Sequence, residues 1–486
     1  MHPIRTMYVL KEKEAKHVKS HNLLEMLSRT VKRFPERTAL SWEENDELHK
    51  LSYQRLWNMI RDFAFGLEKI GIRSGAKIAI IAENHPRWVI CEFAVLSLGA
   101  TSVPIHPNRH PDQIRKILRH ADATGIITDR YELLEKVKGA SNLLQHSILL
   151  NGKADGSLGA LQFETIIQIG QSIANEEQEW AYPSIQPSDV AIIYYPNDKT
   201  KTEKGVLLSH GNILNNLQSF LYVIPYTKHD HLLSVLSLSH PFERIAGYLA
   251  PLATGAEITY IARDANWVKA SKRIKPTLFS LSPVLVHTIY EYLNKQIQSS
   301  PAKKYLFQHA LRQAEKIYGL KRKGYNWSVP SSLQLHHSIS QTLLFAPLQK
   351  QLGGRVRFIL SGGAPLNEKV HRFFWCINLP VVESYYLTEC ASVISATNLS
   401  CPQPKTAGKP LPGIELRIQA DGELMIKIPQ VISGYYKIPL SDTNVYTNGW
   451  ISTGDHAEMD ADGTLHNLRR KVELDPQKAV LPTAVH

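Results

Sequence analysis

The sequence predicts an α/β protein in which parallel sheets are flanked by helices, followed by a smaller β-rich part. Short apolar runs alternate with helical patterns along most of the chain, as α/β layering requires. From about Pro402, short strands separated by Pro-Gly and Asp-Gly turns replace that pattern. The 486 residues are enough for two or three domains or subdomains.

The expected elements follow in order. Residues 88–98 are apolar at helical spacing, and Gly99 ends that helix. Residues 213–221 predict a second helix, and the polar, basic stretch 299–340 predicts surface helices with loops. Apolar runs predict strands at residues 77–82, 101–105, 125–128, 147–150, 191–195, 206–209, 414–418 and 423–428.

Composition excludes several classes of protein. Hydrophobic residues make up 43% and charged residues 21%, values typical of a globular protein. No run approaches the roughly 18 apolar residues of a membrane span, and the polar N-terminus does not resemble a secretory signal, which predicts a cytoplasmic protein. Four dispersed cysteines and the lone His336-His337 pair predict buried thiols and surface histidines, and argue against a disulfide framework or a zinc site.

The formal net charge is +12. A basic surface would attract nucleotides, coenzyme A, anionic lipid or nucleic acid without distinguishing among them. A solvated basic face is the simpler interpretation of Lys303-Lys304 and Lys321-Arg322-Lys323. No basic-aromatic cluster supports a specific nucleic-acid partner.

Seven segments carry the chemical information because of their order along the chain. They are residues 191–195 (AIIYY), 204–212 (KGVLLSHGN), 236–244 (LSLSHPFER), 360–366 (LSGGAPL), 383–389 (ESYYLTE), 408–413 (GKPLPG) and 449–455 (GWISTGD). Together they resemble the adenylate-forming superfamily. The segment 236–244 and the run 352–359 (LGGRVRFI) resemble its AMP-forming long-chain fatty acyl-CoA synthetases. The resemblance extends from about Asn22 to Leu474.

The resemblance implies a large AMP-binding N-terminal domain over residues 1–468, with two α/β subdomains and a β-rich subdomain at about 402–468. It also implies binding of ATP or AMP, Mg²⁺ and coenzyme A, with a fatty acid as substrate. Tyr385 resembles the tyrosine that stacks on adenine, Asp455 the acceptor for the ribose hydroxyls, and Arg470 a second ribose or phosphate contact. Small residues let the backbone approach the base: Gly362, Gly363, Ala364 and Pro365.

A second set of residues resembles the catalytic groups. Thr388 matches the residue that bonds the α-phosphate, and Glu389 matches the acid that holds Mg²⁺. His240 matches the residue near the acyl carboxylate, and Thr200 and Lys204 are retained in the phosphate loop. Taken alone, Tyr385 would be a core aromatic, Asp455 a turn cap and His240 a structural histidine. The order of the motifs favours function for Asp455, Glu389 and Thr388, and leaves both interpretations of His240 open.

The phosphate loop departs from the family pattern Tyr-Thr-Ser-Gly-Thr-Thr-Gly-x-Pro-Lys-Gly. Asp198 and Lys201 replace its glycines, and Asn197 replaces its serine. Glycines let successive N–H groups converge on phosphate oxygens, and the Asp198 carboxylate would repel phosphates, so we expect weakened pyrophosphate binding. Tyr386 and Ile428 also replace family glycines, and Tyr386 would crowd the nucleotide or narrow the acyl tunnel.

The family's mobile C-terminal domain is expected to be missing, with residues 469–486 as a hinge and remnant. Either the lid was lost or the chain is a fragment, and a separate protein could supply the lid. The sequence thus predicts an impaired AMP-forming long-chain fatty acid-CoA ligase, cytoplasmic and in peripheral contact with a membrane. The alternative is a non-catalytic scaffold that binds a nucleotide, an acyl chain or a partner protein.

Overall fold

The computed structural model forms two compact units. Unit 1 comprises residues 1–265, 388–392 and 430–440, and unit 2 comprises residues 266–387, 393–429 and 441–486. The structure describes residues 20–44, 47–152, 158–174, 180, 182–196, 204–262, 266–322, 329–399, 403–428, 434–439 and 445–470.

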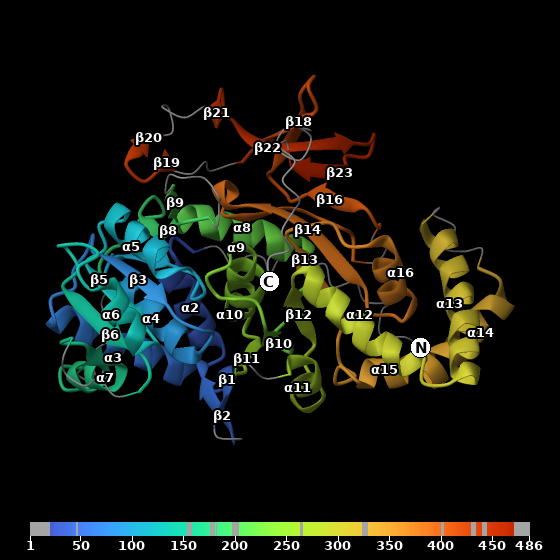
Figure 1. The fold of residues 1–486 in the computed structure, drawn as a ribbon, viewed down its shortest axis with the longest axis horizontal. Helices are drawn as coiled ribbons and strands as arrows, with labels where there is room; N and C mark the ends of the chain where they lie inside the picture. The colour runs from blue at the N-terminus through green and yellow to red at the C-terminus, as the bar shows by residue number, and fades with distance from the viewer. Residues whose placement is uncertain are drawn as a thin grey trace. The chain divides into compact units, whose positions relative to one another are not determined.

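Unit 1 contains a nine-stranded sheet of order β20-β19-β9-β8-β4-β3-β5-β6-β7 (Figure 1). Its strands are β3 (Lys77–Ile81), β4 (Thr101–Pro104), β5 (Gly125–Thr128), β6 (His146–Leu149), β7 (Leu161–Gln162), β8 (Val190–Tyr194), β9 (Val206–Ser209), β19 (Gly434–Tyr435) and β20 (Ile438–Pro439). The strands from β8 to β7 pair in parallel, whereas β8–β9, β9–β19 and β19–β20 are antiparallel. The expectation of parallel sheets is therefore wrong at this edge, because β9 pairs antiparallel with β8, the strand that precedes it in the sequence.

Helices connect and cover these parallel strands. α4 (Pro86–Ser97) follows β3, with Pro86 at its first turn and His85 as its N-cap. α5 begins in the same way, with His110 before Pro111. The helices of this sheet are α3 (Tyr53–Lys69), α4, α5 (Pro111–His120), α6 (Tyr131–Val137) and α7 (Phe163–Gln171).

A second sheet region of unit 1 has the order β10-β11-β1-β2. Its strands are β10 (His231–Ser234), β11 (Glu257–Tyr260), β1 (Thr38–Glu44) and β2 (Glu47–Ser52). β10–β11 and β11–β1 are parallel, and β1–β2 form an antiparallel hairpin. The other helices of the unit are α2 (Leu23–Arg33), α8 (His210–Val223), α9 (Pro241–Glu243), the π-helix η3 (Arg244–Leu249), α10 (Ala250–Thr254) and the 3₁₀ turn η5 (Thr388–Cys390).

A buried ion pair anchors the segment 236–244 in unit 1. Arg244 Nη2 donates to both carboxylate oxygens of Glu92 at 2.8 Å, and its guanidinium carbon lies 5.5 Å from the centroid of the Trp88 ring. Ser102 Oγ donates to Glu92 Oε1 at 2.9 Å. The pair ties α4 to η3, and thereby fixes the short helix α9, whose N-cap is His240.

Unit 2 contains strands in the order β17-β18-β22-β23-β16-β15-β14-β13-β12. They are β12 (Leu278–Leu281), β13 (Phe358–Gly362), β14 (Val381–Leu387), β15 (Ser392–Ala396), β16 (Thr406–Pro410), β17 (Glu415–Ile418), β18 (Glu423–Lys427), β22 (Trp450–Met459) and β23 (Leu465–Arg470), with β21 (Tyr446–Thr447) paired to β22. β12, β13 and β14 are parallel. From β15 to β17 the pairs are antiparallel, as the turn-rich C-terminal sequence predicts.

The basic stretch 299–340 of unit 2 contains two helices, as predicted. α13 (Pro301–Arg322) buries Phe307 and Ala314, whereas no residue of α14 (Ser331–Ser340) is buried. The remaining helices are α11 (Trp267–Ile274), α12 (Pro283–Ile297), the π-helix η4 (Gln341–Phe345), α15 (Ala346–Lys350) and α16 (Glu368–Cys376).

The predicted fold class is confirmed, and the predicted strands match the observed ones to within about two residues. Cys91, Cys376 and Cys390 are buried free thiols, as expected, and Cys401 lies outside the described residues. Among the described residues no helix is long and apolar enough to cross a membrane.

We predict that Glu92→Ala lowers the free energy of unfolding by about 3–5 kcal/mol, because it leaves the Arg244 guanidinium buried without its counter-charge. The matched control is Arg29→Ala, which breaks an exposed pair with Glu25 and should cost less than about 1 kcal/mol. Urea unfolding of both variants measures the difference. Equal losses would show that the buried pair does not anchor the segment.

Candidate nucleotide-binding site

The predicted adenosine-binding residues lie in unit 2, at the ends of β13 and β14. The two strands pair in parallel, with Gly362 opposite Ser384, so that Tyr385 follows directly on the neighbouring strand. Gly362 is buried, and Gly363, Ala364 and Pro365 are exposed in the turn beyond it. The carboxyl ends of these strands therefore present small residues on β13 beside an aromatic residue on β14.

Tyr385 and Asp455, which are 70 residues apart, meet directly. Tyr385 Oη donates to Asp455 Oδ2 at 2.6 Å, and both residues are buried, with exposed fractions of 8% and 4%. The Asp455 N–H donates to Thr453 Oγ1 at 3.0 Å. The sequence predicted roles for both residues, but it did not predict this bond, which fixes the ring of Tyr385 against the carboxylate.

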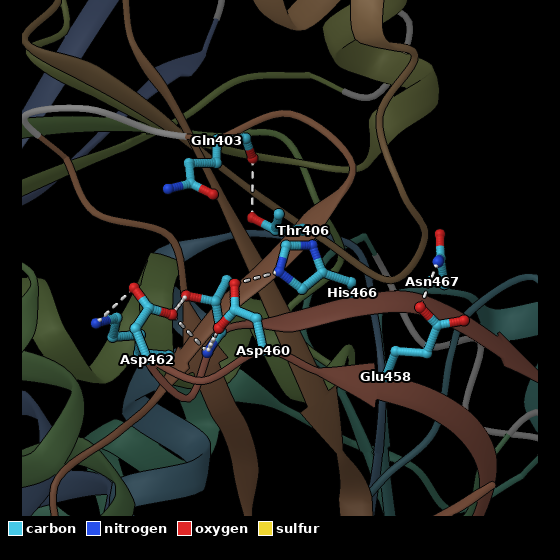
Figure 2. A network of polar contacts seen from close by, with 9 residues as sticks. Gln403, Thr406, Glu458, Asp460, Asp462, His466 and Asn467 are labelled. Carbon is cyan, nitrogen blue, oxygen red and sulfur yellow. Dashed lines mark hydrogen bonds and ion pairs between the residues drawn. The ribbon is translucent and has the colours of Figure 1, made fainter. Parts of the chain in front are cut away.

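A polar turn holds the strand pair that carries Asp455 and Arg470. In the backbone ladder Asp455 on β22 lies opposite Arg470 on β23. Figure 2 shows the connection between these strands: His466 Nε2 lies 2.7 Å from Asp460 Oδ2, and Asn467 Nδ2 donates to Glu458 Oε2 at 3.0 Å. Because these bonds close the hairpin, they set the register in which Asp455 and Arg470 face each other.

Tyr386, the residue that replaces a family glycine, lies against the small-residue turn. Gly363 has φ = +106°, and a Cβ placed on it would lie 3.2 Å from Tyr386 Oη. A side chain at Gly363 is therefore disfavoured both by the backbone conformation and by the tyrosine. The phenol occupies space beside the turn that a glycine at position 386 would leave open.

Glu383 is a buried carboxyl group that the sequence analysis did not single out. Its Oε2 accepts the Leu366 N–H at 2.8 Å, and its own N–H donates to Thr397 Oγ1 at 2.9 Å. Glu383 Oε1 lies 3.6 Å from His371 Nε2. Burial raises the pKa of Glu383 to about 7 and lowers the pKa of His371 to about 4. The only feature of the sequence that pointed to Glu383 was its position as the first residue of segment 383–389.

The predicted Mg²⁺ ligand lies in unit 1. Thr388 and Glu389 form the turn η5, which is tied to α8 by a hydrogen bond of 3.2 Å from Asn216 Nδ2 to the Cys390 carbonyl. The turn is followed by two non-glycine residues with positive φ, Ala391 at 60° and Ser392 at 134°. Such backbone strain persists only where the surrounding structure enforces it, and it is frequent at functional sites.

Tyr435 brings two predicted residues of unit 1 together. Its hydroxyl donates to Glu389 Oε1 at 2.9 Å, and Lys204 Nζ lies 5.8 Å from the centroid of its ring. Burial, followed by the charge of Glu389, raises the pKa of Tyr435, so the phenol stays protonated at neutral pH. Sequence reasoning did not find Tyr435, because it lies 46 residues after Glu389 and outside the seven segments.

His240 is the N-cap residue of α9, and its carbonyl accepts the Arg244 N–H at 3.0 Å. Burial, followed by the charge of the nearby His106, lowers the pKa of His240 to about 4, so the imidazole is neutral at pH 7. A neutral imidazole can donate an N–H hydrogen bond to a carboxylate and so orient it, without placing a positive charge beside it. Thr200 and the replaced loop residues Asn197, Asp198 and Lys201 lie outside the described residues.

The donor set suits a hard cation that is shared with phosphate. In the described part of the chain no three His, Cys, Asp or Glu side chains form a metal-binding group. Mg²⁺ commonly takes one or two carboxylates and completes its shell with substrate phosphates and water. Tyr435 donates its hydrogen bond to Oε1 of Glu389. The second carboxylate oxygen, Oε2, is the one that would bind Mg²⁺.

Curated relatives match most of the chain. The long-chain-fatty-acid–CoA ligase FadD15 of Mycobacterium bovis is 26% identical over 456 residues, covering 89% of this chain and 73% of that protein. The chloroplastic long-chain-fatty-acid–acyl-carrier-protein ligase AEE15 of Arabidopsis thaliana is 26% identical over 477 residues, covering 88% of this chain and 65% of that protein.

Solved structures have the same fold. A long-chain-fatty-acid-CoA ligase from Archaeoglobus fulgidus aligns with a TM-score of 0.72 at 18% identity, covering 93% of this chain and 85% of that chain. The N-terminal domain of FACL13 from Mycobacterium tuberculosis aligns with a TM-score of 0.68 at 17% identity, covering 93% of this chain and 100% of that chain.

The model of the AMP-binding enzyme family matches residues 27–436, within which lie the small-residue turn, Tyr385 and the Glu389–Tyr435 pair. This chain belongs to the AMP-binding enzyme family.

Proposed function

We propose that this chain is an AMP-forming ligase that joins a long-chain fatty acid to coenzyme A. The observation that carries the proposal is the buried Tyr385–Asp455 hydrogen bond beside the small-residue end of β13. Membership of the AMP-binding family and the names of the two curated relatives support it.

In the proposed nucleotide site, Asp455 accepts hydrogen bonds from the ribose hydroxyls and Tyr385 stacks on the adenine. Residues Gly362 to Pro365 let the backbone approach the base, since their side chains are small. Arg470 provides a second contact to ribose or phosphate. The hydrogen bond from the Tyr385 hydroxyl positions the Asp455 carboxylate, and this contact supports placing the two residues in one site.

The proposed reaction has two steps. A carboxylate oxygen of the fatty acid attacks the α-phosphorus of ATP, and the bond to the leaving pyrophosphate breaks. The thiolate of coenzyme A then attacks the acyl carbon and releases AMP. Thr388 bonds the α-phosphate, Lys204 and Thr200 contact the departing phosphates, and the neutral His240 orients the carboxylate. Glu389 would hold Mg²⁺, which neutralises charge developing on the phosphates when it is bound.

The proposal also covers organisation and location. Residues 1–468 would form the nucleotide-binding large domain, and residues 469–486 the start of a hinge to a lid domain, which a separate protein could supply. The proposed location is the cytoplasm, at the surface of a membrane from which the fatty acid is taken.

A non-catalytic scaffold is the second candidate, and Tyr386 favours it. Its phenol lies beside Gly363, within the turn proposed for adenine. A protein of this kind would bind AMP or an acyl ligand without releasing pyrophosphate.

Pyrophosphate release distinguishes the two candidates. The purified chain is incubated with ATP, Mg²⁺ and a panel of fatty acids, with coenzyme A in half of the reactions, next to an Asp198→Gly/Lys201→Gly variant. We expect fatty-acid-dependent release that increases in the variant, because glycines restore converging backbone N–H groups. No release from either protein, together with saturable AMP binding, would contradict the ligase proposal and support the scaffold.

The raised pKa of Glu383 predicts a pH-dependent stability that Glu383→Gln removes. A carboxyl group with a folded-state pKa near 7, above its ordinary value, stabilises the fold at acidic pH and loses that contribution as the pH rises through 7. The amide of the variant does not titrate. The difference in unfolding free energy, variant minus wild type, should therefore rise by about 2–3 kcal/mol between pH 5 and pH 8.5.

Urea unfolding at the two pH values measures this gain, and Glu415→Gln, at an exposed carboxylate, is the matched control. A difference between variant and wild type that does not change with pH would contradict the buried, proton-holding role of Glu383.

A further inference from the structure

The helices α14 and η4 of unit 2 carry a stripe of exposed aliphatic side chains. Leu335, Ile339 and Leu343 are exposed by 61%, 50% and 67%. They follow one another at intervals of four residues, a spacing that places side chains on one side of a helix. Large aliphatic side chains that stay in contact with water in a repeated pattern, and not singly, indicate an interaction surface.

The beginning of α13 adjoins this stripe. Figure 1 shows α13 and α14 side by side, and the two helices are in contact. The Phe307 and Phe345 ring centroids lie 6.1 Å apart, which places the first turns of α13 next to η4. Tyr305 and Leu306, in those turns, are exposed by 71% and 54%. We call these five exposed side chains, which lie on helices in contact with one another, the apolar stripe; in the described part of the chain they are five of the twelve large hydrophobic residues that are exposed.

The same segment is strongly basic. Residues 301–350 contain eight lysines and arginines and a single acidic residue, Glu315, so they supply most of the chain's formal net charge of +12. Lys304, Arg312 and Lys316 on α13 are exposed, as is Lys350 at the end of α15. Cations therefore accompany the apolar stripe along its helices.

We propose that the apolar stripe and its accompanying cations dock onto a membrane leaflet that contains anionic lipids. The aliphatic side chains would enter the boundary between headgroups and acyl chains, while the lysines and arginines contact the negative surface. The proposal supplies the surface for the membrane location that is part of the proposed function, and it is tested without ligase activity.

Charge and chemistry favour this partner over two others. Two copies of the chain meeting through the stripe would bring the same basic segments together, which repel each other. Nucleic acid would satisfy the cations, but three of the five side chains on the stripe are leucines and one is isoleucine, which do not stack on bases as aromatic side chains do.

Vesicle co-sedimentation tests the proposal with the purified full chain and no substrate. The vesicles are phosphatidylcholine alone, or phosphatidylcholine with about one third phosphatidylserine, and each is measured at low and high salt. The test variant is Leu335→Ser/Ile339→Ser/Leu343→Ser. Leu48→Ser/Leu143→Ser/Ile173→Ser is the matched control, because these three residues are exposed by 48%, 47% and 47% and lie in unit 1.

We expect wild type and control to bind the anionic vesicles at least tenfold more tightly than the neutral ones, with weaker binding at high salt. The test variant should lose at least tenfold in affinity for the anionic vesicles while keeping its thermal unfolding midpoint. Equal vesicle binding by wild type and test variant would overturn the proposal. So would a wild-type dimer that the test variant alone abolishes, or binding of a single-stranded RNA that it alone loses.

Discussion

The hydrogen bond from Tyr385 Oη to Asp455 Oδ2 joins two parts of unit 2, one with parallel and one with antiparallel strands. Tyr385 belongs to a parallel strand of the α/β layer, and Asp455 to an antiparallel strand of the C-terminal sheet. A buried carboxylate requires hydrogen-bond donors, and a buried phenol requires an acceptor, so each group satisfies the other. The position of the proposed adenosine site depends on this pair.

Polar contacts between buried groups also hold other predicted residues within each unit. Glu383 holds the Leu366 N–H at the far end of the small-residue turn, so the turn is fixed on both sides of its exposed residues. In unit 1 the phenol of Tyr435 holds Glu389, and the Glu92–Arg244 pair holds the segment that contains His240. Asp455 and Glu389 thus each accept a hydrogen bond from the hydroxyl of a buried tyrosine, the kind of support that preorganised sites require.

The sequence predicted the fold class and most strands because apolar runs, helix caps and turns are local signals. It did not predict that β9 pairs antiparallel with β8, since apolar alternation does not show strand direction. The sequence analysis also missed the residues that hold the predicted site residues in place. Tyr435 and Glu383 act through contacts that only the folded chain creates, and Glu383 had no local feature beyond its place at the start of a motif. Tyr386 was identified as a departure from the family, and the structure adds that its hydroxyl lies beside Gly363.

Binding of AMP, measured by calorimetry, tests the central claim most directly, because it needs neither the phosphate loop nor a lid. Wild type is compared with Asp455→Asn and with Glu415→Gln, a control at an exposed carboxylate of the same unit. We predict saturable binding by wild type and control, and at least a tenfold loss in Asp455→Asn, because an anionic acceptor for the ribose hydroxyls is removed. Equal affinity of all three proteins, or no binding by wild type, would contradict the assignment of this site.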